Sequence, residues 1–441
     1  MILNIKNSRL FIVFTLIIFS VIYLISLFNL QDISYLILFP LIIGLFILKK
    51  EFIIILYLIV LPTAGIIPSE ANFMEAFGLD EIVNIIIIFY FMRNDFIKEK
   101  INSIQKNLTT LLYFMILLTF FLNLKNAFFE IYDGEFFLVL KRTLFVTLKY
   151  FPIVFIIRYL NDIRLRQNII LGLLLSGIVL VISQIFTEHL SSINLITVDD
   201  SEFGYFPSDV VNRFSGFYNG DPNSLGAYLT MLVGILFIMF NNNKKSIHLY
   251  FLIIFFISGV FITASRTAII SLALIFLLFL YYNNSKRFSL QLILIMLIPT
   301  YFSFDFIINQ LSRFETASVQ LSTSVEGNRI VKWIYYLNFM YENPEYFITG
   351  AQEEINNRAA HNVYIQMLYN LGILPVIIFT FTLFRSFIML AKTYIKTLYY
   401  IVPFLFITLY VGELYELPFY IIISALIIGD LKYIYTRKKI N

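Results

Sequence analysis

Long apolar runs alternate with short polar segments along the chain. The runs are commonly about 17 residues or more, the length that an α-helix needs to cross the hydrocarbon core of a bilayer. The pattern predicts an all-α, polytopic membrane helical bundle of about 12–14 transmembrane helices. The predicted spans are residues 10–30, 33–48, 52–68, 80–92, 108–124, 143–159, 167–186, 223–240, 247–264, 266–282, 288–304, 361–384, 397–412 and 415–431.

The composition supports this prediction. The 441 residues are 59% hydrophobic and only 14% charged, with a mean hydropathy of +0.83, which is too apolar for a soluble domain of this length. We therefore expect a single integral membrane domain over residues 1–441. The first apolar run is too long for the core of a signal peptide, so it is interpreted as a retained helix. The chain has no cysteine, which excludes disulfides and thiol chemistry.

The charged residues orient the predicted bundle. With the N-terminus inside, the inner segments hold 22 of the 32 cations and five of the 28 acids, a net charge of +17 against −13 for the rest of the chain. Cytoplasmic loops collect Lys and Arg in this way. Both termini are therefore predicted to be cytoplasmic.

Two predicted extracytoplasmic segments are long, residues 187–222 and the large loop 305–360. Loops of this length with no span of their own are usually functional. Within the second, apolar residues recur at three- and four-residue steps between about 327 and 343. This spacing predicts a short helix that ends before Pro344 and lies on the membrane surface or caps the bundle.

A few cations lie on the predicted outer side against the charge rule, and Arg213, Arg266 and Arg329 are the three singled out. A guanidinium stays charged and binds phosphate through two parallel hydrogen bonds. Together they indicate a site for an anionic group at the outer membrane surface. The alternatives are a snorkelling arginine at a helix end for Arg266, and solvated or acid-paired loop charges for the other two.

His361 and Asn362 open the predicted span 361–384. We expect His361 in the first helical turn, where the helix N-terminus and nearby arginines disfavour imidazolium and leave a neutral general base. The alternative is an interfacial or capping role, and Asn362 is expected to cap the helix or to orient the histidine. Lys149, an ionisable residue inside a predicted span, is a candidate for a lipid-phosphate groove, or it snorkels or pairs with an acid.

The stretches RFSGFYNGDPNSLGAYL, TASRTAII, EGNRIVKW and NRAAHNVYIQMLYNLG, in this order and on one predicted membrane face, resemble the O-antigen ligase and polymerase superfamily. The resemblance covers about residues 205–385. One departure is in FITGAQEEINN, where relatives often have a Gly-x-Gly turn and this chain has Gly350 alone. The positions that match the family pattern are Arg213, Gly216, Asn223, Ser265, Arg266, Arg329, Trp333, His361 and Asn362.

The resemblance implies a helical bundle with a large outer loop over a lateral cavity, in the bacterial cytoplasmic membrane. It implies transfer of a glycan from undecaprenyl pyrophosphate to a sugar hydroxyl, without metal or cofactor. The arginines would stabilise the leaving pyrophosphate and His361 would deprotonate the attacking hydroxyl. The residues expected to bind substrate are Asn362, Asn223, Asp221, Lys332, Trp333 and Lys149.

The expected partners are the lipid-linked donor and acceptor glycans, membrane lipids and a chain-length regulator, with no nucleic acid. The favoured activity is polymerisation of repeat units into O-antigen or capsular polysaccharide. The first alternative is a ligase that transfers the glycan to a lipid A core or a protein. The second is a flippase or transporter of lipid-linked oligosaccharides, whose cations are expected to line a central cavity rather than one outer mouth.

Overall fold

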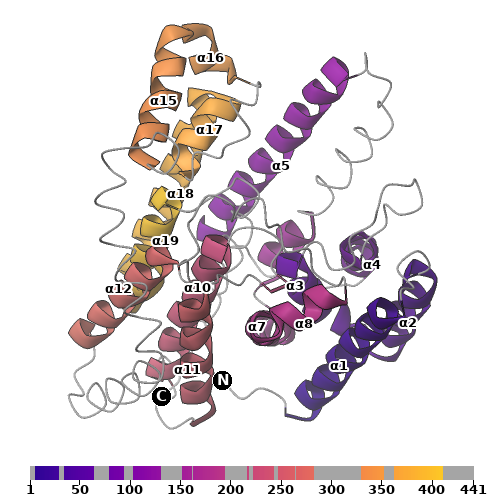
Figure 1. Cartoon of the computed structure of the whole chain (residues 1–441). Helices are drawn as coiled ribbons and strands as arrows, with labels where there is room; N and C mark the ends of the chain where they lie inside the picture. The colour runs from indigo at the N-terminus through magenta and orange to yellow at the C-terminus, as the bar shows by residue number, and fades with distance from the viewer. Residues whose placement is uncertain are drawn as a thin grey trace.

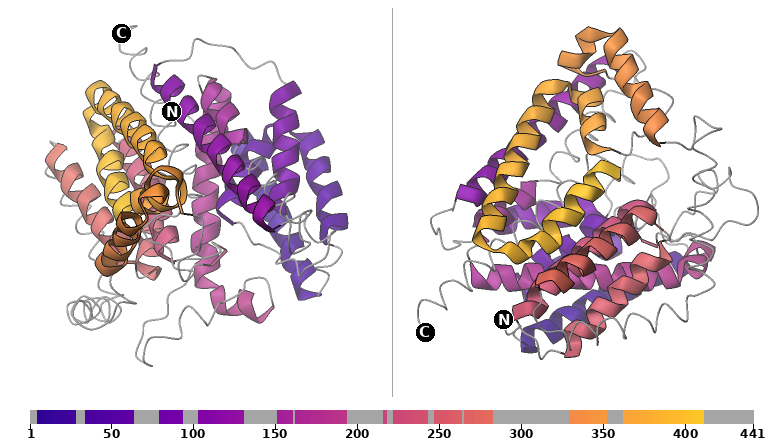
Figure 2. Two further views of the ribbon diagram at one scale, coloured as in Figure 1. Left: turned by 90° about the horizontal axis from the view of Figure 1, so that it is seen from above. Right: turned by 90° about the vertical axis from the view of Figure 1, so that its left-hand side faces the viewer.

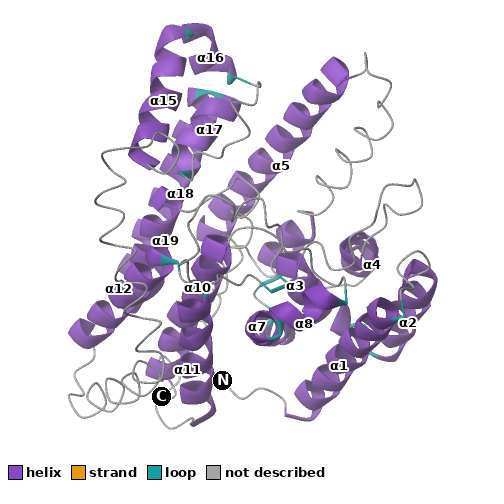
Figure 3. Cartoon of the chain, viewed as in Figure 1, coloured by secondary structure: helices purple, strands orange, loops and turns teal. Residues whose placement is uncertain are grey.

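A computed structural model of the chain is built from helices and connecting loops (Figures 1 and 3). Within the residues that it describes there is no β-strand, so the all-α prediction is confirmed for them. The structure describes residues 5–28, 34–63, 79–93, 103–130, 151–160, 162–193, 216–217, 222–242, 247–263, 265–282, 329–351 and 362–410.

The observed helices follow the predicted spans. Spans 288–304 and 415–431 lie outside the described residues, and each of the others contains helix; in span 143–159 the helical part is 151–158. The labelled α-helices are α1 Ile5–Leu27, α2 Ser34–Leu48, α3 Phe52–Val60, α4 Leu79–Arg93, α5 Ser103–Glu130, α7 Ile163–Ile185, α8 Thr187–Ser192, α10 Pro222–Asn242, α11 Ile247–Ile262, α12 Arg266–Tyr282, α15 Arg329–Glu342, α16 Pro344–Thr349, α17 Val363–Leu371, α18 Ile373–Thr393 and α19 Leu398–Tyr410.

Four helices among the described residues are long and apolar enough to cross a membrane, by length and composition. They are Arg9–Leu27, Arg164–Ile185, Pro222–Met239 and Ile373–Thr393. The structure thus supports a helical membrane protein. The larger number of spans, the large outer loop and the orientation of the termini stay predictions.

Helix α10 lies at the centre of the described fold and packs against α7, α11, α12 and α19. Two glycines allow this close packing. A Cβ atom on Gly234 would lie 3.0 Å from the Tyr399 carbonyl oxygen of α19, and one on Gly226 would meet the α11–α12 junction. A hydrogen bond of 2.5 Å between the Ser176 and Tyr228 hydroxyls also joins α7 to α10.

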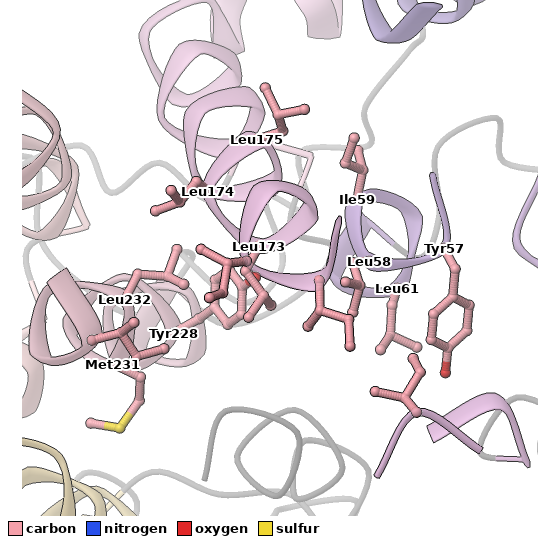
Figure 4. Close-up of a cluster of buried hydrophobic side chains, with 14 of the residues drawn as sticks. Tyr57, Leu58, Ile59, Leu61, Leu173, Leu174, Leu175, Tyr228, Met231 and Leu232 are labelled. Carbon is pink, nitrogen blue, oxygen red and sulfur yellow. The ribbon is translucent and has the colours of Figure 1, made fainter. Parts of the chain in front are cut away.

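The N-terminal half packs on the same core through α3 and α7. All nine residues of α3 are buried, and a Cβ atom on Gly172 of α7 would lie 3.2 Å from the Ile55 Cα atom. Figure 4 shows apolar side chains of α3, α7 and α10 that gather here. At nine residues, α3 is about 14 Å long and does not cross a hydrocarbon core of about 30 Å by itself.

The predicted span 361–384 is corrected by the structure, because it is two helices. Helix α17 ends at Leu371, Gly372 adopts a positive φ of 82°, and α18 begins at Ile373. Helix α17 then folds back along α18, and the rings of Tyr364 and Phe379 lie 6.2 Å apart. The apolar pattern continues past Gly372, which is why the sequence predicts a single span here.

Helices α15, α16 and α17 pack against one another in what we call the α15–α17 unit (described residues 329–351 and 362–371), and α17 joins the unit to the main core through the buried Val363, Met367 and Leu371. In Figure 1 it stands at the top of the molecule, beyond the upper ends of α10 and α12, and the right-hand view of Figure 2 shows it again at the top. Its own buried cluster consists of Tyr336, Met340, Ala351 and Tyr369. The predicted short helix 327–343 is confirmed as α15, which ends at Glu342 before Pro344.

Candidate functional site

The starts of α10 and α12 meet in what we call the α10–α12 corner, made of Asn223, Gly226, Thr263, Ser265 and Arg266. A Cβ atom on Gly226 would lie 2.7 Å from Thr263 Oγ1 and 3.1 Å from the Ser265 Cβ atom. Only glycine at this position lets the two helix ends approach so closely. Asn223 and Arg266, both half-buried, are therefore held on adjoining helix starts.

Two buried hydroxyls set the start of α12. The Ser265 backbone N–H donates to Thr263 Oγ1 at 3.3 Å, and the Ala268 N–H donates to Ser265 Oγ at 3.4 Å. Serine before a first helical turn caps the free N–H groups in this way. The Ser-Arg pair thus has a local physical role: Ser265 begins the helix and Arg266 occupies its first position.

Asn362 is the N-cap of α17 and is almost fully buried. Its side-chain oxygen accepts hydrogen bonds from the Tyr364 N–H at 3.0 Å and the Ile365 N–H at 3.1 Å. The capping alternative for Asn362 is thereby observed. The expectation that His361 lies in the first turn is corrected, because α17 begins at Val363 and the histidine precedes the cap.

Helix α19 links the start of α17 to the α10–α12 corner. The Tyr364 hydroxyl of α17 lies 3.3 Å from Thr408 Oγ1, near the end of α19. The beginning of α19 contacts the far end of α12, with the rings of Phe279 and Tyr399 5.8 Å apart. Since α19 runs antiparallel to α12 and packs along it, the Asn362 cap is at the same end of these helices as Arg266.

The remaining described candidates are on α15, in the α15–α17 unit. Arg329 is the first residue of this helix, and Lys332 and Trp333 are half-buried one turn later. Helix α15 packs on α16 and α17, and the Tyr336 ring contacts the Tyr369 ring of α17 at 4.9 Å. Burial raises the pKa of Tyr336 above its ordinary value, and Tyr335 adds to the shift.

Four candidates lie outside the described residues: Arg213, Asp221, His361 and Lys149. The segment that carries Arg213 is described at Gly216 and Phe217 only. The Phe217 N–H donates to Ser183 Oγ of α7 at 2.9 Å, and the Phe217 ring lies 5.8 Å from that of Phe19. A Cβ atom on Gly216 would collide with the same Ser183 hydroxyl, so this matched glycine is at a close approach between the loop and α7.

The sequence interpretation missed three hydroxyl residues that build the site end: Thr263, Tyr364 and Thr408. Thr263 and Thr408 are fully buried, and Tyr364 is half-buried. Thr263 is two residues before Ser265, and Tyr364 is two residues after Asn362. This closeness to matched positions is the only signal in the sequence that could have pointed to them. Thr408 has no such signal, because it lies in the apolar sequence of α19 and reaches Tyr364 through the fold alone.

The described residues of the site offer hydroxyl, amide and guanidinium groups. Among the described residues, no three His, Asp or Glu side chains lie close enough to hold a metal ion. Comparison of the chain with models of protein families, with curated proteins and with solved structures finds no match. The superfamily therefore stays a resemblance carried by the ordered motifs of the sequence.

Proposed function

We propose that the chain is a membrane glycosyltransferase that joins undecaprenyl-pyrophosphate-linked repeat units into O-antigen or capsular polysaccharide at the outer face of the bacterial cytoplasmic membrane. The observation that carries the proposal is the α10–α12 corner. It brings together the starts of α10 and α12, which carry Asn223 and Arg266, two positions that the motifs single out in separate stretches of the sequence. The Asn362 cap, preceded by His361 in the chain, is at the same end of the helices.

In this reaction a hydroxyl of the acceptor sugar attacks C1 of the donor glycan. The new C1–O bond forms as the bond from C1 to the pyrophosphate oxygen breaks, and undecaprenyl pyrophosphate leaves with the electron pair. His361 takes the proton of the hydroxyl, a role for an imidazole that is neutral near pH 7. Arg266, with Arg213 and Arg329, stabilises the negative charge that develops on the leaving group.

Deletion of the gene followed by profiling of the surface glycan tests the class of activity. A polymerase predicts that single repeat units remain and long chains are lost. Unattached long chains would instead indicate the ligase, and repeat units held on the inner leaflet would indicate a flippase. Either of these results would overturn the polymerase proposal.

Arg266 provides the sharpest test at a described residue. Arg266→Ala is expected to lower the rate of polymer formation by about 100- to 1,000-fold, the loss seen when one charge-stabilising donor is removed. Arg266→Lys should rescue poorly, because lysine lacks the planar fork that binds phosphate. The rate is measured with purified protein and lipid-linked substrate, and Arg385→Ala, which changes an exposed arginine of α18, is the matched control. A normal rate for Arg266→Ala would remove this residue from the site.

His361 separates proton transfer from hydrogen bonding. His361→Ala should lose roughly 100- to 10,000-fold in rate, and the rate of the natural protein should fall at acidic pH as the imidazole becomes protonated. His361→Gln keeps a hydrogen-bonding group but takes up no proton, so it should be nearly as inactive. Near-normal turnover by His361→Gln would assign the base elsewhere, with Asp221 and Glu326 the first residues to examine because each flanks a matched motif.

A further inference from the structure

One face of α15 is apolar and uncovered. Ile334, Leu337 and Tyr341 follow the i, i+3, i+7 spacing that aligns side chains on one side of a helix, and they are 51%, 46% and 87% exposed. The opposite face supplies Tyr336 and Met340 to the buried cluster of the α15–α17 unit. Helix α15 is therefore apolar on two faces, and only one of these faces is buried within the unit.

The next helix extends this surface. Phe347 and Ile348 of α16 are 42% and 70% exposed, and Pro344 begins that helix directly after α15. Polar side chains lie beside the stripe rather than on it, since Asn338 and Glu342 project from a different sector of α15. A polar sector next to an apolar stripe is typical of a helix at a boundary between water and an apolar phase.

The surface adjoins the outward face of α18. That face carries an exposed apolar stripe along one of the four helices long enough to cross a membrane. Gly372, at the start of α18, is in contact with the Ile348 carbonyl of α16, and Leu374, two residues on, is 61% exposed. The stripe of α18 consists of Leu374, Ile377, Phe381, Phe384 and Ile388.

The exposed apolar stripe of α18 is shorter than the hydrocarbon core of a bilayer. From Leu374 to Ile388 the helix rises about 21 Å, less than the hydrocarbon core of about 30 Å. Lys392 is exposed four residues beyond Ile388, as a cation at a membrane boundary is, and Arg385 is exposed in the last turn of the stripe, from which its long side chain reaches the same boundary. The missing apolar length is therefore at the Leu374 end, where α16 and then α15 continue the surface. Tyr335 and Tyr341 provide the aromatic side chains that gather at the headgroup level.

We propose that the exposed face of α15 and α16 is a lipid-binding surface that inserts at the boundary between headgroups and acyl chains of the bilayer leaflet at the Leu374 end of α18. The occupant of this face is phospholipid, and the surface anchors the α15–α17 unit to the membrane. The inference stands independently of the proposed reaction, because it rests on exposure and continuity with α18 alone.

The chain has no cysteine, so single-cysteine variants carry a spin label at one chosen position without other changes. Leu337→Cys and Tyr341→Cys place the label on the stripe, and Asn338→Cys and Glu342→Cys are matched controls on exposed polar positions of the same helix. All four side chains are exposed, so the labelled proteins should fold. The full-length protein is reconstituted in phosphatidylcholine vesicles, and collisions of each label with oxygen and with a water-soluble nickel complex are measured.

Labels on the stripe are expected to collide preferentially with oxygen, which concentrates in the acyl region, and labels at the control positions with the nickel complex. Preferential nickel collisions at all four positions would overturn the proposal, because the stripe would then face water. Spin–spin broadening at Tyr341→Cys that disappears on dilution with unlabelled protein would also overturn it, because a second copy of the chain would then cover the face.

Discussion

Helix α10 and the α15–α17 unit are held in place by different means. In α10, 89% of the membrane-length stretch is buried, and side chains and backbones of four neighbouring helices surround it. The α15–α17 unit has a buried cluster of four residues, and three side chains of α17, Val363, Met367 and Leu371, join it to the core. Its helix α16 is held against the end of α17 by backbone contacts at two glycines. The core therefore depends on many distributed contacts, whereas α15 and α16 depend on α17 and on a few backbone contacts.

The two glycines of the unit, Gly350 and Gly372, form what we call the glycine clasp. Both have positive φ values, 77° and 82°, which L-residues with a Cβ atom rarely adopt. A Cβ atom on either one would collide with backbone of the partner segment, namely the Asn370 or the Ile348 carbonyl. The Ala351 N–H completes the clasp by donating to the Tyr369 carbonyl at 2.7 Å.

This difference predicts which helices a substitution destabilises in each region. Four helices surround α10, so a change there is shared by several helices and lowers the stability of the whole fold. The clasp holds the end of α16 against the end of α17 through backbone atoms, so a change there should release α15 and α16 while leaving α17 and the core folded. Local opening of one unit below the free energy of global unfolding is general behaviour in proteins.

The largest effect is expected for Gly372→Ala. The unfavourable φ alone costs about 1–3 kcal/mol, and the collision with the Ile348 carbonyl adds to it. Hydrogen exchange in detergent should show faster exchange in α15 and α16 and unchanged protection in α10. The control is Gly44→Ala, since a Cβ atom on Gly44 of α2 meets no atom within 4 Å. Equal loss of protection in α10 would show that the unit and the core unfold together.

Gly226→Ala should have a smaller but global effect. The new Cβ atom would meet Thr263 Oγ1 and the Ala268 Cβ atom, both of which are side-chain atoms that shift as α12 moves outward. Overpacking of this kind costs about 1–3 kcal/mol. We expect a lower midpoint of thermal unfolding and a lower rate of polymer formation, because Arg266 moves with the start of α12. If the midpoint falls while the rate at low temperature is unchanged, the spacing of the corner does not matter for the reaction.

The sequence was sufficient to predict helices whose apolar pattern is bounded by polar residues. The three- and four-residue steps near Trp333 predicted α15 to within two residues at its start, and the Ser-Arg pair marked the start of α12 at Arg266. In both cases the local pattern changes sharply at the boundary, so no tertiary information is needed.

Tertiary contacts decide the features that the sequence did not reveal. Nothing in an apolar run distinguishes the turn at Gly372 from a glycine that packs inside a helix, such as Gly234, because the difference lies in the partner backbone. The fold-back of α17 onto α18 and the pairing of Tyr364 with Thr408 have the same origin. The arginines were selected by the charge rule alone, which places residues on a membrane face but does not bring them together.

The smallest effect on stability concerns the cap of α17, where the unit meets the candidate site. Asn362→Ala removes the oxygen that accepts from Tyr364 and Ile365, and loss of such a cap typically costs about 1 kcal/mol. Asn362→Ser retains a capping oxygen, so its thermal unfolding should resemble that of the natural protein.

The two variants separate the capping role from any contact of the amide with substrate or with His361. If Asn362 only caps, the serine variant retains the rate of polymer formation and the alanine variant loses a little through α17. If the amide acts in the site, the serine variant is stable but slow, because a serine hydroxyl lacks the reach and the paired donors of the asparagine side chain.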